Sequence, residues 1–215
     1  MAATRVPRAA ARRARERKIV DATRALFDER GAEDVRIDHI ARRAGINKAL
    51  IYRHFASKEE LFALTTARYL AELGARLDAV DAQSALPPER LRQGFEALAD
   101  YGIAHPAFLD CTFSLLRRPA EDLRARVSDH VWLTLGQAMT GCVGWLARVL
   151  DDLHVAEPEL RANQLYLQAI GVLHLARSGA GLHGLMPGMP EAFPVSSAQV
   201  RAACVDVALA AAKLD

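Results

Sequence analysis

The segment AGINKALIYRHF, Ala44 to Phe55, gathers side chains that can bind a nucleic acid. Plotted at about 100° per residue, a helix that follows Asn47 turns Ile51 inward and a mixed surface outward. The outward surface consists of Ala49, Leu50, Tyr52 and Arg53, with Lys48 and His54 beside them. In a DNA major groove, Ala permits close approach, Leu can contact a thymine methyl, and Tyr, Lys and His can reach phosphates. The alternative is an ordinary surface helix, because single exposed Leu and Tyr residues are common.

Two short helices joined by a tight turn position these side chains. The first is predicted from about Ile37 to Ala44, with its apolar residues at helical spacing. Gly45 supplies the turn, and Asn47 can cap the second helix by accepting from its free N–H groups. This length and turn chemistry are typical of a helix-turn-helix.

The neighbouring helices complete a small domain. A preceding helix is predicted from about Ala11 to Arg30, ended by Gly31. Ser57 is expected to cap a following helix that runs to about Asp78, with Glu60 completing a capping box.

The charge distribution agrees with a polyanion partner at one end of the chain. The net charge of the whole chain is only +2. Residues 1–58 carry 15 Lys and Arg against 7 Asp and Glu, whereas residues 59–215 carry 13 against 19. A basic N-terminal segment followed by an acidic remainder favours a nucleic acid that is bound by the N-terminal segment only.

The rest of the chain also predicts an all-α fold, since no long stretch alternates with period two. Helices are expected from Pro87 to about Gly102, from Pro106, from Ala120 to about Leu150, from Glu159 to Ser178, and from Ala198 to Lys213. A loop is expected over residues 179–197.

An apolar ligand site is expected among these later helices. The long helix has a wide apolar face that contains Gly136, Gly141 and Gly144, which either leave space for a ligand or permit close packing or a kink. The candidate lining residues, with two histidines to orient a polar group, are His105, Phe108, Phe113, Trp132, Met139, Trp145, Tyr166 and His174. A histidine near apolar residues is also a common core group, and Cys142 beside Trp145 either packs or acts as a redox-sensing thiol.

Two apolar helices predict a dimer. Residues 159–178 are apolar almost all round in the segment LYLQAIGVLHLA, and residues 198–213 are rich in small apolar residues. A two-fold four-helix interface built from both would cover them, the alternative being two ordinary core helices.

The segment from Ile19 to Phe62 resembles the tetracycline-repressor (TetR) family of transcription regulators. It carries the apolar spacing of the family's first helix, the IA..AG of the second, the Y.HF of the third and the SKEEL that opens the fourth. The resemblance implies an all-α homodimer with an N-terminal DNA-binding domain and a helical domain that binds a small molecule. It also implies DNA contacts at Lys48, Tyr52, His54 and Lys58.

Two departures from the family pattern affect DNA recognition. Asn47-Lys48-Ala49-Leu50 stands where the family often has Ser-Lys-Gly-Thr, so a hydrogen-bonding Thr is missing. Val35-Arg36 stands where Thr is frequent, so a phosphate contact there would come from Arg36. The operator sequence therefore cannot be transferred from a relative.

Together these features predict a helix-turn-helix domain over residues 1–58 with a basic arm, a connecting helix over 59–78, and an effector and dimerisation domain over 79–215. The expected function is a ligand-responsive regulator: a repressor that binds a palindromic operator as a homodimer and is released by a mainly apolar molecule. The alternatives are a constitutive or architectural DNA-binding protein without an effector, and a helical enzyme.

Other function classes lack their sequence patterns. There is no P-loop, GxSxG, paired Glu-x-x-His or metal-spaced cluster, so no enzyme, metal or cofactor is expected. No apolar run reaches the roughly 18 residues that span a bilayer, and the basic first segment lacks the apolar core of a secretory signal. Three dispersed cysteines favour a reducing cytoplasm.

Overall fold

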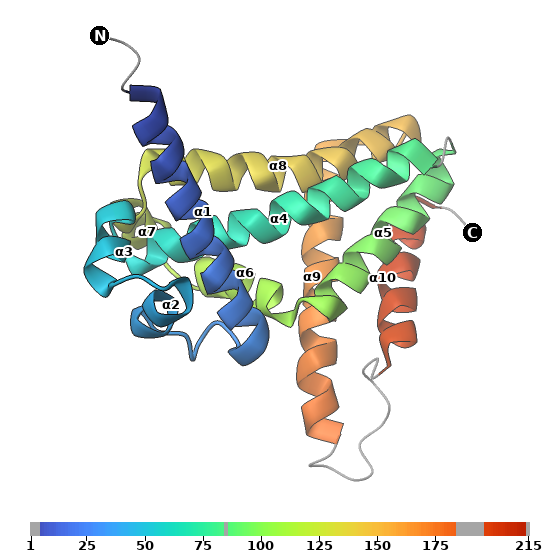
Figure 1. Cartoon of the computed structure of the whole chain (residues 1–215). Coiled ribbons are helices and arrows are strands. Elements are labelled where there is room, and N and C mark those ends of the chain that lie inside the picture. The colour runs from blue at the N-terminus through green and yellow to red at the C-terminus, as the bar shows by residue number, and fades with distance from the viewer. Residues whose placement is uncertain (1–4, 84–85, 184–195, 214–215) are drawn as a thin grey trace. The chain divides into compact units, whose positions relative to one another are not determined.

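The computed structural model describes residues 5–83, 86–183 and 196–213, and these residues form α-helices joined by turns (Figure 1). The predicted all-α fold is confirmed. The helices are α1 (Arg5–Arg30), α2 (Ile37–Ala44), α3 (Lys48–His54), α4 (Lys58–Gln83), α5 (Pro87–Ala104), α6 (Pro106–Leu116), α7 (Ala120–Arg126), α8 (Asp129–Asp152), α9 (Pro158–His183) and α10 (Ser197–Ala211).

The chain divides into two compact units. The first comprises Met1–Arg68 and Pro106–Gly136, and the second comprises Tyr69–His105 and Gln137–Asp215. Helices α4 and α8 each contribute residues to both units. This division follows compactness, and the functional domains expected over 1–58, 59–78 and 79–215 stay predictions.

The first unit encloses a core between α1, α2, α3 and the first turns of α4. Ile19, Phe27, Ile40, Ile51 and Phe55 are each at most 2% exposed. The rings of Phe27 and Phe62 meet edge to face with centroids 4.6 Å apart, which is a favoured aromatic geometry. This core fixes the orientation of α3, because one side of that short helix is anchored through Ile51.

The helix bounds around this core agree closely with the sequence pattern. Helix α2 spans Ile37–Ala44 as predicted, and Gly31 and Gly45 have φ of 78° and 65°. Both glycines therefore occupy the left-handed region that favours glycine after a helix end. Helix α1, by contrast, begins at Arg5 rather than Ala11, because Pro7 lies in the first turn, where proline is tolerated, and the Arg and Ala residues after it favour a helix.

The long helix predicted from Ala120 is wrong in one respect: it is broken at Val127 and Ser128 into α7 and α8. Val127 has extended backbone angles and is 4% exposed, packed in a cluster with Ala63 and Val131. The burial of Val127 and the hydrogen bonds of Ser128 outweigh the local helix propensity. Tertiary contacts therefore interrupt a segment whose sequence reads as one helix.

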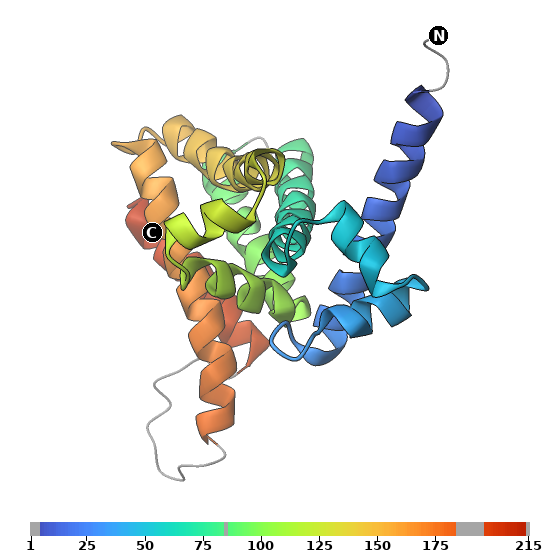
Figure 2. The same cartoon turned by 90° about the vertical axis from the view of Figure 1, so that its left-hand side faces the viewer.

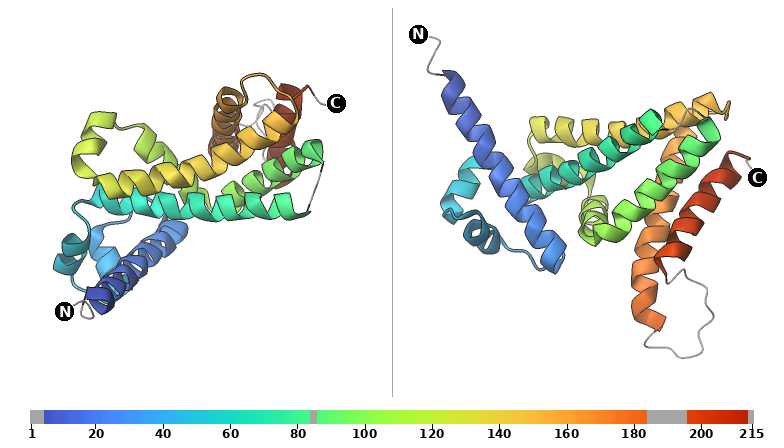
Figure 3. Two further views of the ribbon diagram at one scale, coloured as in Figure 1. Left: turned by 90° about the horizontal axis from the view of Figure 1, so that it is seen from above. Right: turned by 45° about the vertical axis from the view of Figure 1, so that its right-hand side comes forward.

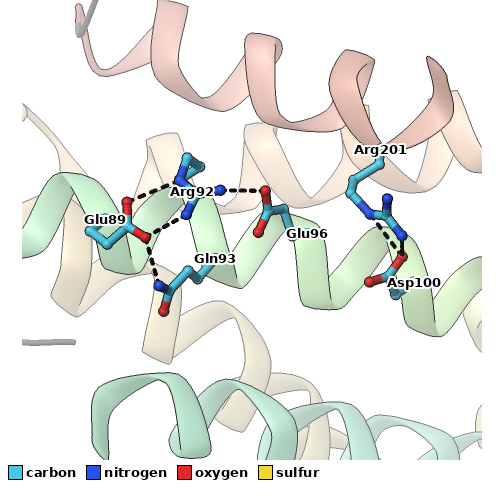
Figure 4. A network of polar contacts seen from close by, with 6 residues as sticks. All are labelled: Glu89, Arg92, Gln93, Glu96, Asp100 and Arg201. Carbon is cyan, nitrogen blue, oxygen red and sulfur yellow. Dashed lines mark hydrogen bonds and ion pairs between the residues drawn. The ribbon is translucent and has the colours of Figure 1, made fainter. Parts of the chain in front are cut away.

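The second unit is a bundle in which α5, α9 and α10 pack side by side (Figure 3). Helix α10 begins at the N-cap Ser196, whose hydroxyl accepts from the Gln199 N–H, and it buries Val200, Cys204 and Ala208. Arg201 of α10 also binds Asp100 of α5, with Nε 2.9 Å from Oδ1 (Figure 4). Such a half-exposed ion pair adds little stability, so burial of the apolar residues holds α10 in place and the pair favours its register.

Arg92 of α5 forms a second polar cluster among half-buried side chains of that helix. Its guanidinium donates to Glu89 and Glu96, one turn away on either side, and Gln93 also donates to Glu89 (Figure 4). These bonds lie within a single helix and stabilise α5 itself.

The glycines that permit close packing are not those predicted. Gly136 and Gly141 are exposed, and a Cβ built on either would meet no atom within 4 Å. Gly94 of α5 instead lies against the indole of Trp145, which a Cβ there would overlap. The glycines of α8 therefore neither make a ligand space nor permit close packing within this chain. Among the described residues no helix is both long and apolar enough to cross a membrane.

Candidate functional site

Helix α3 is capped at its first turn as its sequence requires. Asn47 is the N-cap, and its Oδ1 accepts from the Leu50 N–H at 2.8 Å. The last residue before the next turn, Phe55, closes the helix through its N–H to the Ile51 carbonyl at 2.9 Å. A helix of only seven residues is marginal alone, so the cap and the buried Ile51 hold its outward surface in place.

The outward surface of α3 carries the side chains expected to contact DNA. Tyr52 is 49% exposed, and Ala49 and Arg53 are exposed as well. Lys48 is more than half exposed, and its Nζ lies 3.1 Å from Asp38 Oδ1 of α2. Leu50 is half-buried beside this surface. The arrangement presents a phenol, cationic groups and a small residue on one side of a rigid helix.

His54 is placed differently from the phosphate contact expected of it. Its side chain is only 8% exposed, and Nδ1 lies 3.3 Å from Glu16 Oε1 of α1. The side chain is therefore turned toward α1 at the end of α3. Its position favours a role in holding α3 against α1 rather than in contacting a phosphate.

Two further cationic candidates stand on neighbouring helices. Arg36 is exposed at the N-cap of α2. Lys58, the first residue of α4, is half-buried with Nζ 4.7 Å from the centroid of the Phe62 ring, a cation–π distance. This contact of the Lys58 ammonium with the Phe62 ring restricts where the ammonium can reach.

The start of α4 is tied to the turn between α7 and α8. Ser57 Oγ accepts from the Glu60 N–H at 2.9 Å, as the capping box predicts, and donates to the Arg126 carbonyl at 2.6 Å. Glu60 is 5% exposed, and its carboxylate accepts from the Ala56 N–H and from the Ser128 hydroxyl. We call these residues, Ser57, Glu60, Arg126 and Ser128, the α4 junction.

An ion-pair cluster borders the α4 junction. Glu59 Oε1 lies 3.2 Å from Arg118 and 3.8 Å from Arg126, and the Glu59 side chain is 15% exposed. The segment that follows α6 and the end of α7 are thus attached beside Lys58. The sequence could not indicate these bonds, because their partners are about 60 to 70 residues apart.

The second unit contains a small apolar cavity of about 20 Å³. Its lining residues come from α4, α5, α8 and α9, and none is charged: Leu73, Leu77, Gly94, Phe95, Leu98, Cys142, Trp145, Leu146 and Tyr166. Trp145 Nε1 and Tyr166 OH are buried and form no hydrogen bond with any described residue. Burial raises the pKa of the Tyr166 phenol, so that group stays neutral.

Of the eight residues predicted to line a ligand site, only Trp145 and Tyr166 line this cavity. Phe108, Phe113 and Trp132 belong to the first unit. Met139 and His174 are half-buried on α8 and α9, and the His105 ring packs on that of Tyr101 with centroids 4.6 Å apart. Leu73 and Leu77 of α4 also line the cavity, whereas the sequence pattern predicts only a connecting role for that helix. Their i,i+4 spacing is that of a buried helix face and could have indicated them.

Cys142 packs rather than reacts. The thiol is 2% exposed, and Sγ lies 3.3 Å from the Leu70 carbonyl. Burial raises the pKa of Cys142 to about 12, so the reactive thiolate is scarce at neutral pH. Cys111 and Cys204 are also buried and free. Among the described residues no three His, Cys, Asp or Glu side chains are grouped to hold a metal ion.

Comparison with known proteins gives similarities in both sequence and fold. Residues 19–65 match the profile of bacterial regulatory proteins of the tetR family. The chain is similar to the HTH-type transcriptional regulator BetI of Brucella canis, with 36% identity over 77 residues, 36% of this chain and 39% of BetI. It is also similar to an HTH-type transcriptional repressor of Streptomyces coelicolor, with 32% identity over 96 residues, 45% of this chain and 46% of the repressor. The aligned segment thus spans less than half of the length of these relatives.

Solved structures share the fold over most of the chain. A transcriptional regulator from Rhodococcus sp. Rha1 aligns over 91% of this chain and 96% of its own, with a TM-score of 0.63 and 21% identity. The fatty acid degradation regulator FadR from Bacillus halodurans aligns over 92% of this chain and 94% of its own, with a TM-score of 0.61 and 16% identity. At such identities the likeness extends to the fold alone.

Proposed function

Because the chain belongs to the tetR family of bacterial regulatory proteins, we propose that it is a ligand-responsive transcription regulator. In this proposal it binds a palindromic DNA operator as a homodimer, acts as a repressor, and is released by a small, mainly apolar molecule. The observation that carries the proposal is the outward surface of α3, where exposed Tyr52, Ala49 and Arg53 stand on a helix held by its N-cap and by Ile51.

Each side chain of this surface has a role that its chemistry supports. Tyr52, Lys48, Lys58 and Arg36 are donors suited to phosphate oxygens, which position a protein on DNA. Ala49, Leu50 and Arg53 are the candidates for base edges, since small and apolar side chains can meet a thymine methyl and Arg can donate to guanine. Asn47 and His54 hold α3 in place, the first as its cap and the second through Glu16.

The operator itself provides the direct test. Selection from a pool of randomised duplexes should recover an inverted repeat, because one recognition helix spans only a few base pairs. Its half-sites should lie about one helical turn, roughly 34 Å, apart. Recovery of no common sequence, with equal affinity for all duplexes, would favour an architectural DNA-binding protein. A single half-site bound by one protomer would contradict the dimer.

The dimer proposal is supported by an exposed leucine stripe on α9. Leu160, Leu167 and Leu175 are 53%, 58% and 52% exposed, and their spacing of seven and eight residues brings them to one side of the helix. On α10 three residues of the exposed side, Ala198, Ala202 and Ala210, are small, which permits close approach of another helix, and Asp206 on the same side is charged. We propose that these two surfaces meet their copies across a two-fold axis.

The variant Leu167→Glu is expected to lower the dimer fraction at micromolar concentration, because a carboxylate at the centre of an apolar interface must be desolvated. Analytical ultracentrifugation should detect a shift toward the monomer mass. Leu133→Glu is the matched control, since Leu133 is an equally exposed leucine, at 60%, on α8. An interface on α9 would be contradicted if both variants dissociated to the same extent, or if neither variant dissociated.

The effector proposal is supported by the cavity in the second unit. Its uncharged lining and its two unbonded polar groups, Trp145 Nε1 and Tyr166 OH, fit a neutral and mainly apolar molecule with a hydrogen-bond acceptor. A volume of about 20 Å³ accommodates only about one water molecule, so a larger ligand must displace side chains. That displacement would be the origin of the conformational response.

A further inference from the structure

Residues 9–18 of α1 bury no apolar side chain in the described structure. From Ala9 to Lys18 every side chain except that of Glu16 is exposed, and the first buried side chain of the helix is that of Ile19. We call residues 9–18 the α1 arm. Figure 2 shows α1 continuing well beyond α2 and α3 of the same unit. The ten residues of the arm are about 15 Å long at 1.5 Å per residue.

The α1 arm is strongly basic. Within seven positions it carries five cationic residues and one carboxylate: Arg12, Arg13, Arg15, Arg17 and Lys18, with Glu16. The carboxylate is bound at 2.8 Å by Arg12 Nε. The other four cations are exposed, and no hydrogen bond or ion pair is found for them among the described residues.

A helix with this composition is stabilised by a polyanion. Like charges at i,i+4, such as Arg13 and Arg17, repel each other. The arm also lacks any large apolar residue, so it has neither a face to bury against protein nor the apolar stripe that a membrane-surface helix needs. Phosphates alongside would offset this repulsion.

The arm is attached to the end of α3. Glu16 Oε1 lies 3.3 Å from His54 Nδ1, and His54 is the last residue of α3. His54 follows Leu50 by four residues, so the two stand on the same side of α3. Burial alone would raise the pKa of Glu16, but hydrogen bonds from Arg12 and His54 hold it below its usual range. The arm therefore leaves the domain beside the surface expected to read DNA.

We infer that the α1 arm is a second DNA-binding surface, which holds the phosphate backbone that flanks the bases met by α3. This inference rests on the proposed function and adds to it a surface that binds DNA phosphates without contacting bases. The arm supplies affinity and salt dependence, whereas α3 supplies sequence preference.

The test removes three arm charges without removing the helix. Arg13→Gln/Arg15→Gln/Arg17→Gln keeps good helix formers and leaves the Arg12–Glu16–His54 contacts intact. With six charges lost per dimer, the slope of log K against log salt should become shallower by about two to five units, at roughly 0.9 per phosphate contact. Affinity at about 0.15 M salt should fall at least tenfold, and site selection should recover the unchanged sequence. Hydroxyl-radical protection should be lost only outside the bases read by α3.

The matched control removes the same charge elsewhere. Arg124→Gln/Arg148→Gln/Arg161→Gln alters three exposed arginines of α7, α8 and α9 and should leave the slope unchanged. An unchanged slope in the arm variant, or an equal change in the control, overturns the inference while the proposed function stands. If the arm variant lost binding to anionic lipid vesicles but kept the salt slope for operator binding, the arm would be assigned to a membrane surface. That result would also overturn the inference. If the unaltered protein selects no sequence, the proposed function and the inference fail together.

Discussion

The double variant Lys48→Ala/Tyr52→Ala is expected to bind the operator about 1,000-fold more weakly than the unaltered protein. Each side chain is exposed on α3 and can donate to a phosphate oxygen. A hydrogen bond of this kind contributes about 1 kcal/mol net, and a dimer would lose four of them, or about 4 kcal/mol. Tyr52 should account for the larger share, because Lys48 must exchange its contact with Asp38 for the phosphate.

Fluorescence anisotropy with a labelled operator duplex measures this loss, and thermal unfolding provides the check on folding. Substitutions at exposed positions change the free energy of unfolding little, so the melting temperature should stay within a few degrees. Arg148→Ala, at an exposed arginine of α8, is the control and should bind normally. A double variant that retains more than a tenth of the affinity would mean that α3 does not contact the backbone.

The DNA-binding part of this fold could be predicted from local sequence because its signals are local. Gly31 and Gly45 have positive φ, Asn47 caps α3 and Ser57 caps the Glu60 N–H, each within four residues of the group it serves. The inward positions of α2 follow from helical spacing alone.

The remaining features depend on partners that are distant in sequence. The break between α7 and α8 follows from the burial of Val127 and from the bond between Ser128 and Glu60, 68 residues apart. The inward turn of His54 depends on Glu16, 38 residues earlier. The cavity residues come from four helices, and helical periodicity predicts which side of each is apolar but not which helices meet.

Effector binding is expected to weaken operator affinity about 100-fold, which corresponds to a coupling free energy of about 2.7 kcal/mol. Helix α4 is the connection: Leu73 and Leu77 line the cavity, and Lys58 begins the same helix about 22 Å away along its axis. A molecule that enlarges the cavity must move side chains of α4. Two recognition helices fit successive major grooves at one separation only, so a small shift of α4 would release DNA.

The measurement has two stages. A compound screen uses the variant Trp132→Phe, in which Trp145 of the cavity is the only tryptophan, so a fluorescence change reports on that site. Isothermal titration of a hit into free and operator-bound protein then gives the coupling. By linkage, the operator must weaken binding of the hit by the same factor as the hit weakens binding of the operator.

The α4 junction supplies a variant and a control for this experiment. Ser128→Ala removes the hydroxyl that binds Glu60 and is expected to reduce the coupling while leaving binding of the hit unchanged. Thr134→Ala removes a hydroxyl that bonds only within α8, to the His130 carbonyl, and should leave the coupling intact. Equal affinity of a hit for free and operator-bound protein would mean that the ligand does not regulate DNA binding.

The buried carboxylate of Glu60 has a consequence for how α4 can move. Its oxygens accept from Ala56 and Ser128, and no water replaces these donors easily at 5% exposure. Intermediate positions of α4 would leave the carboxylate without partners, at a cost of about 1–3 kcal/mol or more for a charged group. The helix should therefore exchange between discrete positions instead of drifting through a continuum. In NMR spectra recorded during a ligand titration, the amide peaks of Ala56 and Ser128 should move along straight lines between two end points, because each peak reports the population average of two states.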